Sequence, residues 1–218
     1  MRTKREYLYN RIMVSASSLH SNAATPAPCG LQLLAAATDM SLPYGRLHEA
    51  CGTARQRFGL WLAARTKGPV LWITPEWNTD RLHACGVADI VNPARLIFVT
   101  PRRPEDILWS MEEAMRSGAV DLAIADVPGL PGLTQVRRIH LAAETGGQNR
   151  THAPLGLLLT PGEGGAQGVE TRWALTAQHA APLQSWRLDR LRARRAPQKS
   201  WTITQGPKQA TPTSIQAA

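Results

Sequence analysis

A short segment near the carboxyl end carries the chain's densest group of side chains that could bind another molecule. Six basic residues fall within the stretch RLDRLRARRAPQK, and a tryptophan flanks it on each side. The residues of this group are Trp186, Arg187, Arg190, Arg192, Arg194, Arg195, Lys199 and Trp201. Guanidinium and ammonium groups bind phosphate oxygens, and exposed indole rings stack on bases. We therefore expect a surface for DNA or for an acidic protein partner, and the alternative is a solvated hairpin that only keeps the protein soluble.

The excess of positive charge is confined to the two ends of the chain. The 218 residues include 25 Lys+Arg and 16 Asp+Glu, which gives a formal net charge of +9. Residues 1–20 carry a net +3 and residues 172–218 a net +7, so residues 21–171 carry −1. A partner attracted by charge would meet the ends first. The hydrophobic content of 43% is enough for a packed core, which excludes a wholly disordered chain.

Metal sites and membrane spans have no support in the sequence. The three cysteines, Cys29, Cys51 and Cys85, have no metal-ligand spacing with one another or with a histidine, and their scatter favours a reducing compartment. No apolar run is long enough to cross a membrane. The amino end is basic and Ser-rich like a transit peptide, but a disordered leader, or a start at Met13, fits it better. We expect a cytoplasmic protein that needs no metal or cofactor.

Hydrophobic periodicity predicts the elements that must position these side chains, in an α/β domain over residues 42–178. Short apolar runs predict strands at residues 70–73, 95–99, 120–125 and 155–159, the first two buried on both faces. Apolar spacing and capping residues predict helices around residues 58–64 and over 79–85, 104–117 and 133–145. Strands that alternate with helices through short loops require a parallel sheet with helices on both faces.

The ends are expected to lie outside this domain. Residues 1–41 are interpreted as a basic, disordered leader and linker, and residues 206–218 as a disordered tail. A strand is predicted at residues 170–176. A basic β-hairpin, with strands near 185–191 and 200–204, is predicted in the extension 179–205.

The segment SGAVDLAIAD, from Ser117 to Asp126, resembles the Walker B region of the RecA recombinase family. The preceding segments LWITPEWNTDRLHACG and RLIFVTPRRPED resemble neighbouring parts of the same core, so the likeness extends from Gly45 to about Thr176. The resemblance implies a RecA-like, mostly parallel sheet flanked by helices. It also implies that Glu76 stands where the family keeps its water-activating carboxylate, and Asp126 where it keeps the Walker B aspartate.

The phosphate-binding loop of that family is missing. The motif GxxxxGK[ST] wraps phosphates with backbone N–H groups, while its Lys holds the β/γ oxygens and its Ser/Thr holds Mg²⁺. The matching place here reads HEACGTARQRFGLWLAA, which is shorter and lacks the Lys-Ser/Thr pair, and Arg55 and Arg57 could meet a phosphate only as charges. We therefore expect no conventional ATP hydrolysis and no catalytic residues, with Glu76 and Asp126 as vestigial positions.

The two ends of the core resemble the ImuA family of RecA-like or SulA-like proteins. The resemblance rests on LPYGRLHE, from Leu42 to Glu49, and on WRLDRLRARR followed by Ser200-Trp201. It implies a damage-inducible accessory protein of error-prone translesion DNA synthesis in the bacterial SOS response. The implied partners are an ImuB-like inactive Y-family polymerase and an error-prone replicative-type DNA polymerase, with RecA as a further contact.

Two other functions stay open at this point. One is a RecA-like ATPase with an atypical nucleotide site, which ATP binding abolished by Arg55→Ala together with Arg57→Ala would favour. The other is a cell-division inhibitor of the SulA type, which filamentation on overexpression without any effect on mutagenesis would favour.

Overall fold

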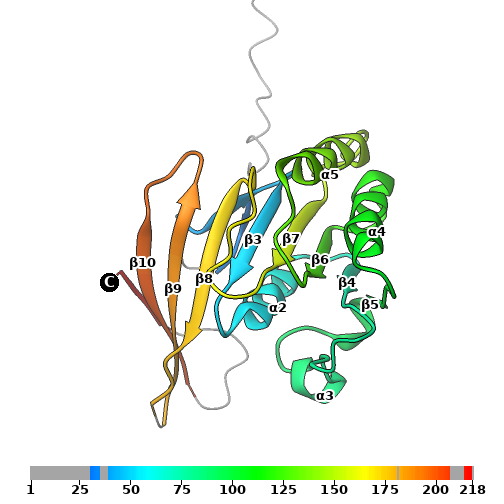
Figure 1. Cartoon of the computed structure of the whole chain (residues 1–218). Helices are drawn as coiled ribbons and strands as arrows, with labels where there is room; N and C mark the ends of the chain where they lie inside the picture. The colour runs from blue at the N-terminus through cyan, green and yellow to red at the C-terminus, as the bar shows by residue number, and fades with distance from the viewer. Residues whose placement is uncertain (1–29, 35–38, 181, 207–213, 218) are drawn as a thin grey trace, which may run out of the picture.

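The computed structural model describes residues 30–34, 39–180, 182–206 and 214–217, and most of these residues belong to one large sheet (Figure 1). Its strands are β3 (Leu47–Cys51), β4 (Val70–Ile73), β5 (Leu96–Val99), β6 (Leu122–Asp126), β7 (Leu155–Leu159), β8 (Thr171–Ala177), β9 (Gln184–Ala193), β10 (Lys199–Gln205) and β11 (Ser214–Ala217). Their order across the sheet is β11-β10-β9-β8-β3-β7-β6-β4-β5. Two further strands, β1 (Gly30–Gln32) and β2 (Ser41–Pro43), form a separate antiparallel pair.

The sheet is parallel from β8 to β5 and antiparallel from β8 to β11. The expectation of an α/β domain with a mostly parallel sheet and a C-terminal hairpin is therefore confirmed. The carboxyl ends of β3, β4, β6 and β7 lie along one edge of the sheet, which is where open α/β sheets place their ligand sites.

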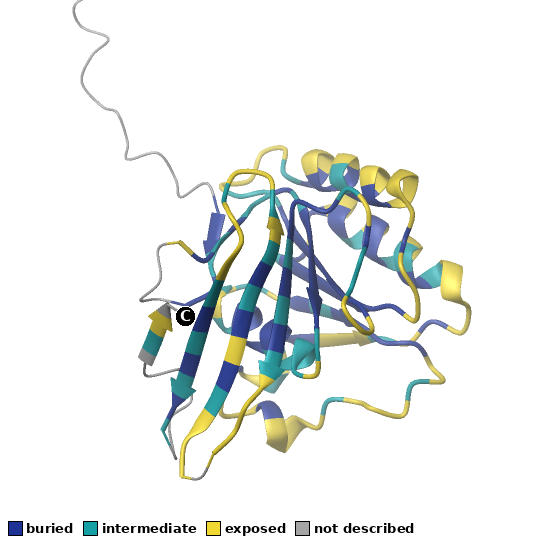
Figure 2. Cartoon of the chain, turned by 60° about the vertical axis from the view of Figure 1, so that its left-hand side comes forward, coloured by how far each residue is buried: buried dark blue, intermediate teal, exposed yellow. Residues whose placement is uncertain are grey.

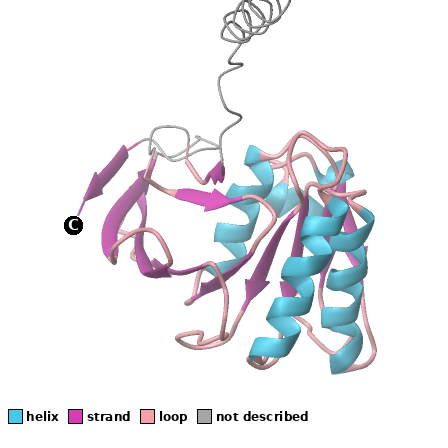
Figure 3. Cartoon of the chain, turned by 90° about the horizontal axis from the view of Figure 1, so that it is seen from above, coloured by secondary structure: helices cyan, strands magenta, loops and turns pink. Residues whose placement is uncertain are grey.

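Helices cover both faces of the parallel part (Figure 3). They are α2 (Arg55–Arg65), the short α3 (Ala84–Val87), α4 (Pro104–Ser117) and α5 (Leu133–Gly146), with a 3-10 turn at Pro93–Arg95. The ends of α4 are those predicted, because Pro104 opens its first turn and Gly118, with φ +63°, takes the left-handed conformation that stops it.

Two hydrophobic cores lie on opposite faces of the sheet. On one face, Phe58 and Trp61 of α2 pack with Trp72 of β4 and with the tryptophans of β8, β9 and β10. On the other face, Met111 and Met115 of α4 pack with apolar residues of α5 and with the sheet. The first core extends under the C-terminal strands, so the predicted hairpin is part of the packed domain.

Strand β5 differs from its prediction as a strand buried on both faces. It is the last strand of the sheet, and its side chains Ile97 and Phe98 are 47% and 52% exposed. An apolar run in the sequence does not show whether its strand lies in the centre or at the edge of a sheet. The position of a strand depends on how the connections between strands cross the sheet.

The helix predicted at residues 79–85 is also wrong over most of its length. Only α3 is helical in this region. The backbone N–H of Asp80 donates instead to the side chain of Asn78 at 2.9 Å, an Asx turn that competes with helix formation.

The predicted boundaries of the ends need correction. Strand β1 and the start of β2 fall inside the segment 1–41 that was interpreted as disordered leader, and β11 falls inside the predicted disordered tail. Residues 1–29 and 207–213 lie outside the described part of the chain.

Candidate functional site

The turn between β3 and α2 stands where the resemblance places the phosphate loop. Three of its backbone donors have partners inside the protein. Gly52 N–H donates to the carbonyl of Gly162 at 3.2 Å, and Ala54 N–H donates to that of Leu175 at 2.9 Å. Arg55 N–H closes the turn on the carbonyl of Gly52 at 3.3 Å. These three groups are therefore committed to protein carbonyls.

Gly52 is required by this tight turn. Its φ is +86°, and a Cβ atom at this position would lie 2.6 Å from the carbonyl oxygen of Leu175. The backbone of Leu175 on β8 therefore lies directly against this turn. The glycine thus serves the packing of the turn against β8.

Asp126 ends β6 at the same edge of the sheet, with its side chain only 7% exposed. Its Oδ2 accepts a hydrogen bond of 2.9 Å from the side-chain amide of Asn78. Its Oδ1 lies 3.7 Å from Nη2 of Arg55, on the first turn of α2. Burial raises the pKa of Asp126, and the charge of Arg55 acts in the opposite direction. The carboxylate is thus held by two side chains of this chain.

Glu76 lies on the loop after β4, at the same edge, but at the surface. Its carboxylate is 3.2 Å from Nε of Arg102, and its side chain is 51% exposed. The two positions named by the resemblance therefore have different environments, since Asp126 is buried and paired with Arg55, whereas Glu76 forms an exposed ion pair.

Three residues of the predicted binding surface are buried, which corrects their assignment to the surface. Trp186, Arg190 and Trp201 are at most 5% exposed. Strand alternation turns their side chains to the face that α2 covers, where no nucleic acid or partner could reach them. Figure 2 shows this alternation of buried and exposed residues along the C-terminal strands.

Arg190 has a structural role within that core. Its guanidinium lies 5.6 Å from the ring centre of Trp173 and 5.2 Å from that of Trp201. It also donates to the backbone carbonyls of Asp39 and Pro197, at 2.7 and 2.9 Å. The cation therefore joins β9 to the segment before β2 and to the turn before β10.

The other five predicted residues are exposed, and we call them the basic arm: Arg187, Arg192, Arg194, Arg195 and Lys199. Arg187 pairs with Asp189 at 3.0 Å, and Lys199 with Asp39 at 2.6 Å. Arg194 lies 3.5 Å from Glu170. Among the described residues, Arg192 and Arg195 have no ion pair. The basic arm therefore keeps an excess of positive charge at the surface.

Glu49, on β3, is a buried residue whose role the sequence does not indicate. Its Oε1 accepts from the Thr160 hydroxyl at 2.8 Å and from the Gly165 and Ala166 N–H groups at 2.7 and 3.1 Å. Its Oε2 accepts from Nε of Arg172 at 2.6 Å. This carboxylate thus fixes the glycine-rich loop after β7, and no motif marks it because its partners are distant in sequence.

Comparison with protein family models and with curated sequences gives no match. No known protein family model fits the chain, and no curated protein is significantly similar to it in sequence. The resemblance to the RecA and ImuA families is therefore a hypothesis that rests on the quoted segments. Within the described residues, no helix is long and apolar enough to cross a membrane, and no group of three or more His, Cys, Asp or Glu could hold a metal ion.

Proposed function

We propose that this protein is a non-catalytic accessory protein with a RecA-like core, which helps to assemble an error-prone translesion synthesis complex in the bacterial response to DNA damage. The observation that supports this most is the turn at Gly52 together with Asp126. The groups that would hold phosphate and metal in an ATPase are used by the protein itself.

The argument against ATP hydrolysis is chemical. A phosphate loop works by pointing unsatisfied N–H groups at the ligand, but Gly52, Ala54 and Arg55 direct theirs to protein carbonyls. A Walker B aspartate must be free to help hold Mg²⁺. The carboxylate of Asp126 instead contacts the side chains of Arg55 and Asn78. A core without a nucleotide site at the Gly52 turn can still serve as a scaffold whose surface binds partner proteins.

The basic arm is the surface that we assign to partner contact. It lies at the end of the sheet farthest from β5, on and beside β9, and its exposed cations suit an acidic segment of a partner protein. DNA phosphates would suit the same cations, so DNA contact by the basic arm is a second component of the proposal.

The test is affinity purification of the tagged full chain from DNA-damaged cells. We expect an ImuB-like inactive polymerase and an error-prone replicative-type polymerase to co-purify with it. A variant in which Arg187, Arg192, Arg194 and Arg195 are all changed to Glu should lose both. Buried Arg190 is left unchanged, because its replacement would unfold the C-terminal strands.

The matched control carries the same four charge reversals elsewhere on the surface, at the exposed Arg81, Arg102, Arg103 and Arg137. It should keep both polymerases. If no polymerase co-purifies with the unmodified chain, the proposal fails, and recovery of cell-division proteins instead would favour an inhibitor of the SulA type.

A further inference from the structure

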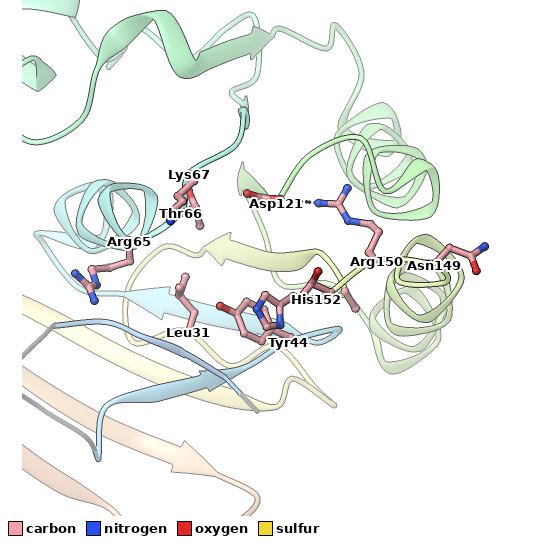
Figure 4. Close-up of a pocket in the computed structure, with 11 residues that line it drawn as sticks. Leu31, Tyr44, Arg65, Thr66, Lys67, Asp121, Asn149, Arg150 and His152 are labelled. Carbon is pink, nitrogen blue, oxygen red and sulfur yellow. Dashed lines mark hydrogen bonds and ion pairs between the residues drawn. The ribbon is translucent and has the colours of Figure 1, made fainter. Parts of the chain in front are cut away.

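A cavity of about 560 Å³ opens at the amino ends of the parallel strands, opposite the edge that carries Asp126. Its walls come from segments that precede strands: Arg65 to Lys67 before β4, Asp121 before β6, and Asn149 to Ala153 before β7. Leu31 and Tyr44 complete it (Figure 4). Its volume falls within the range of pockets for small organic ligands.

An aromatic platform forms one side of this cavity. The rings of Tyr44 and His152 are stacked, with centres 4.4 Å apart and planes inclined by only 10°. Figure 4 shows the pair below Asp121, with Arg65, Thr66 and Lys67 to its left and Arg150 to its right. A flat aromatic ligand could extend such a stack, since nucleobases bind proteins in this way.

Cations outnumber anions around the platform. Arg65, Lys67 and Arg150 line the cavity, and the guanidinium of Arg95 lies just behind, bonded to Thr66 and to the Gly68 carbonyl. The single acid in the lining is Asp121. Its two oxygens are already engaged, one by Arg150 at 2.6 Å and the other by the Gly68 N–H at 2.9 Å. The remaining positive charge would attract an anion.

The backbone is held in an unusual conformation beside this wall. Asn149 has φ +64°, and it is the one non-glycine residue with a positive φ in the described part of the chain. Asparagine adopts this left-handed conformation more readily than most residues, and here it forms part of the turn after α5. This turn leads directly into Arg150 and His152.

From this combination we infer that the cavity binds one nucleotide, with its base on the Tyr44–His152 platform and its phosphate at Lys67. The nucleotide is either free or part of a single strand, because both offer a base and a phosphate. Burial raises the pKa of Tyr44 above its ordinary value of 10.0, and a tyrosine hydroxyl carries its proton at neutral pH in either case. This inference does not rest on the proposed function.

The test measures binding of two probes by the full chain. The first is deoxyadenosine 5′-monophosphate, followed by saturation-transfer difference NMR. The second is a short fluorescein-labelled oligodeoxyadenylate, followed by fluorescence anisotropy. We expect binding of at least one probe, weakened by added salt because a phosphate contact releases counterions.

Two variants probe the two halves of the site. Lys67→Glu removes the phosphate contact and Tyr44→Ala removes the platform, and each should weaken binding about tenfold or more. The matched control is Arg137→Glu, the same charge reversal on the exposed side of α5, which should bind like the unmodified protein. Thermal unfolding of each variant shows that it is folded.

The outcomes separate the possibilities. Binding of both probes assigns the site to free nucleotides as well as strands, and binding of the oligonucleotide alone assigns it to strands. The inference is overturned if neither probe binds, or if binding is insensitive to Lys67→Glu and Tyr44→Ala. Binding that is lost only in Arg55→Ala would also overturn the inference. That result would instead place a nucleotide at the edge of the sheet that carries Asp126.

Discussion

The buried residue His48 should make the stability of this protein depend strongly on pH. Its Nε2 lies 3.0 Å from the carbonyl oxygen of Pro43, which can only accept, so Nε2 carries the ring proton. Its Nδ1 lies 2.7 Å from the hydroxyl of Thr171, and that hydroxyl accepts from the indole N–H of Trp173 at 2.7 Å. Burial favours the neutral ring, in which Nδ1 carries no proton and accepts a hydrogen bond from the Thr171 hydroxyl.

Burial lowers the pKa of His48 to about 4 from its ordinary value of 6.5. Between these two values the unfolded chain binds a proton that the folded protein does not. The free energy of unfolding is then fully maintained above about pH 7 and falls as the pH falls from 6.5 toward 4. From pH 7 to pH 5 the two pKa values give a loss of about 2 kcal/mol from this one group.

The assay is urea unfolding followed by tryptophan fluorescence at pH 7 and pH 5. In His48→Gln, the loss between the two pH values should be smaller than in the unmodified protein by about 2 kcal/mol. The matched control, His83→Gln at an exposed position, should keep the full loss. An NMR titration of the unmodified protein gives a second measurement, in which the His48 ring stays neutral at pH 5.

The comparison isolates His48 because titratable groups that do not interact with it change the free energy of unfolding equally in the unmodified protein and in His48→Gln. His140, whose pKa burial also lowers, is the exception, because its charge lowers the pKa of His48; the same comparison is therefore repeated in the His140→Gln background. A His48→Gln variant with the full pH dependence, or a His48 ring that is protonated at pH 5, would refute the reasoning.

Two further predictions concern the contacts that shape the sheet. Glu49→Gln breaks a buried ion pair and should lower the free energy of unfolding by about 3 kcal/mol or more in urea unfolding, whereas the exposed Glu163→Gln should change it little. Gly52→Ala forces a side chain into a turn with φ +86° and should cost about 2 kcal/mol or more by the same measurement. Gly86→Ala, whose Cβ would meet nothing within 4 Å, should be neutral or slightly stabilising, and an equal cost at both glycines would contradict the steric argument.

Local patterns in the sequence were enough to predict much of the sheet and its helices. The apolar runs at 70–73 and 155–159 are strands with those bounds, and Pro104 and Gly118 mark the ends of α4. These features are determined by residues that are close together in the sequence, so the sequence alone predicts them. Strand β3 was not predicted, because His48 and Glu49 interrupt its apolar pattern, and each bonds to a side chain more than 100 residues away.

In the candidate sites, too, features set by neighbouring residues were predictable from the sequence, and features set by distant contacts were not. The sequence indicated that the turn after β3 is too short for a phosphate loop, and in the structure three of its N–H groups bond to protein carbonyls. It could not indicate which basic residues are exposed. Trp186, Arg190 and Trp201 alternate with less buried neighbours, and only the packing of α2 decides which face is buried. The cavity beside Tyr44 unites residues from five segments, so no motif marks it.

The measurement that tests the central claim most directly is the frequency of mutations induced by ultraviolet light in cells of the native host that lack this gene. The proposed role in error-prone synthesis predicts a clear fall below the frequency of the parent strain, restored by the unmodified gene but not by the variant with a charge-reversed basic arm. A deletion strain with the parent's frequency of induced mutations would contradict the account.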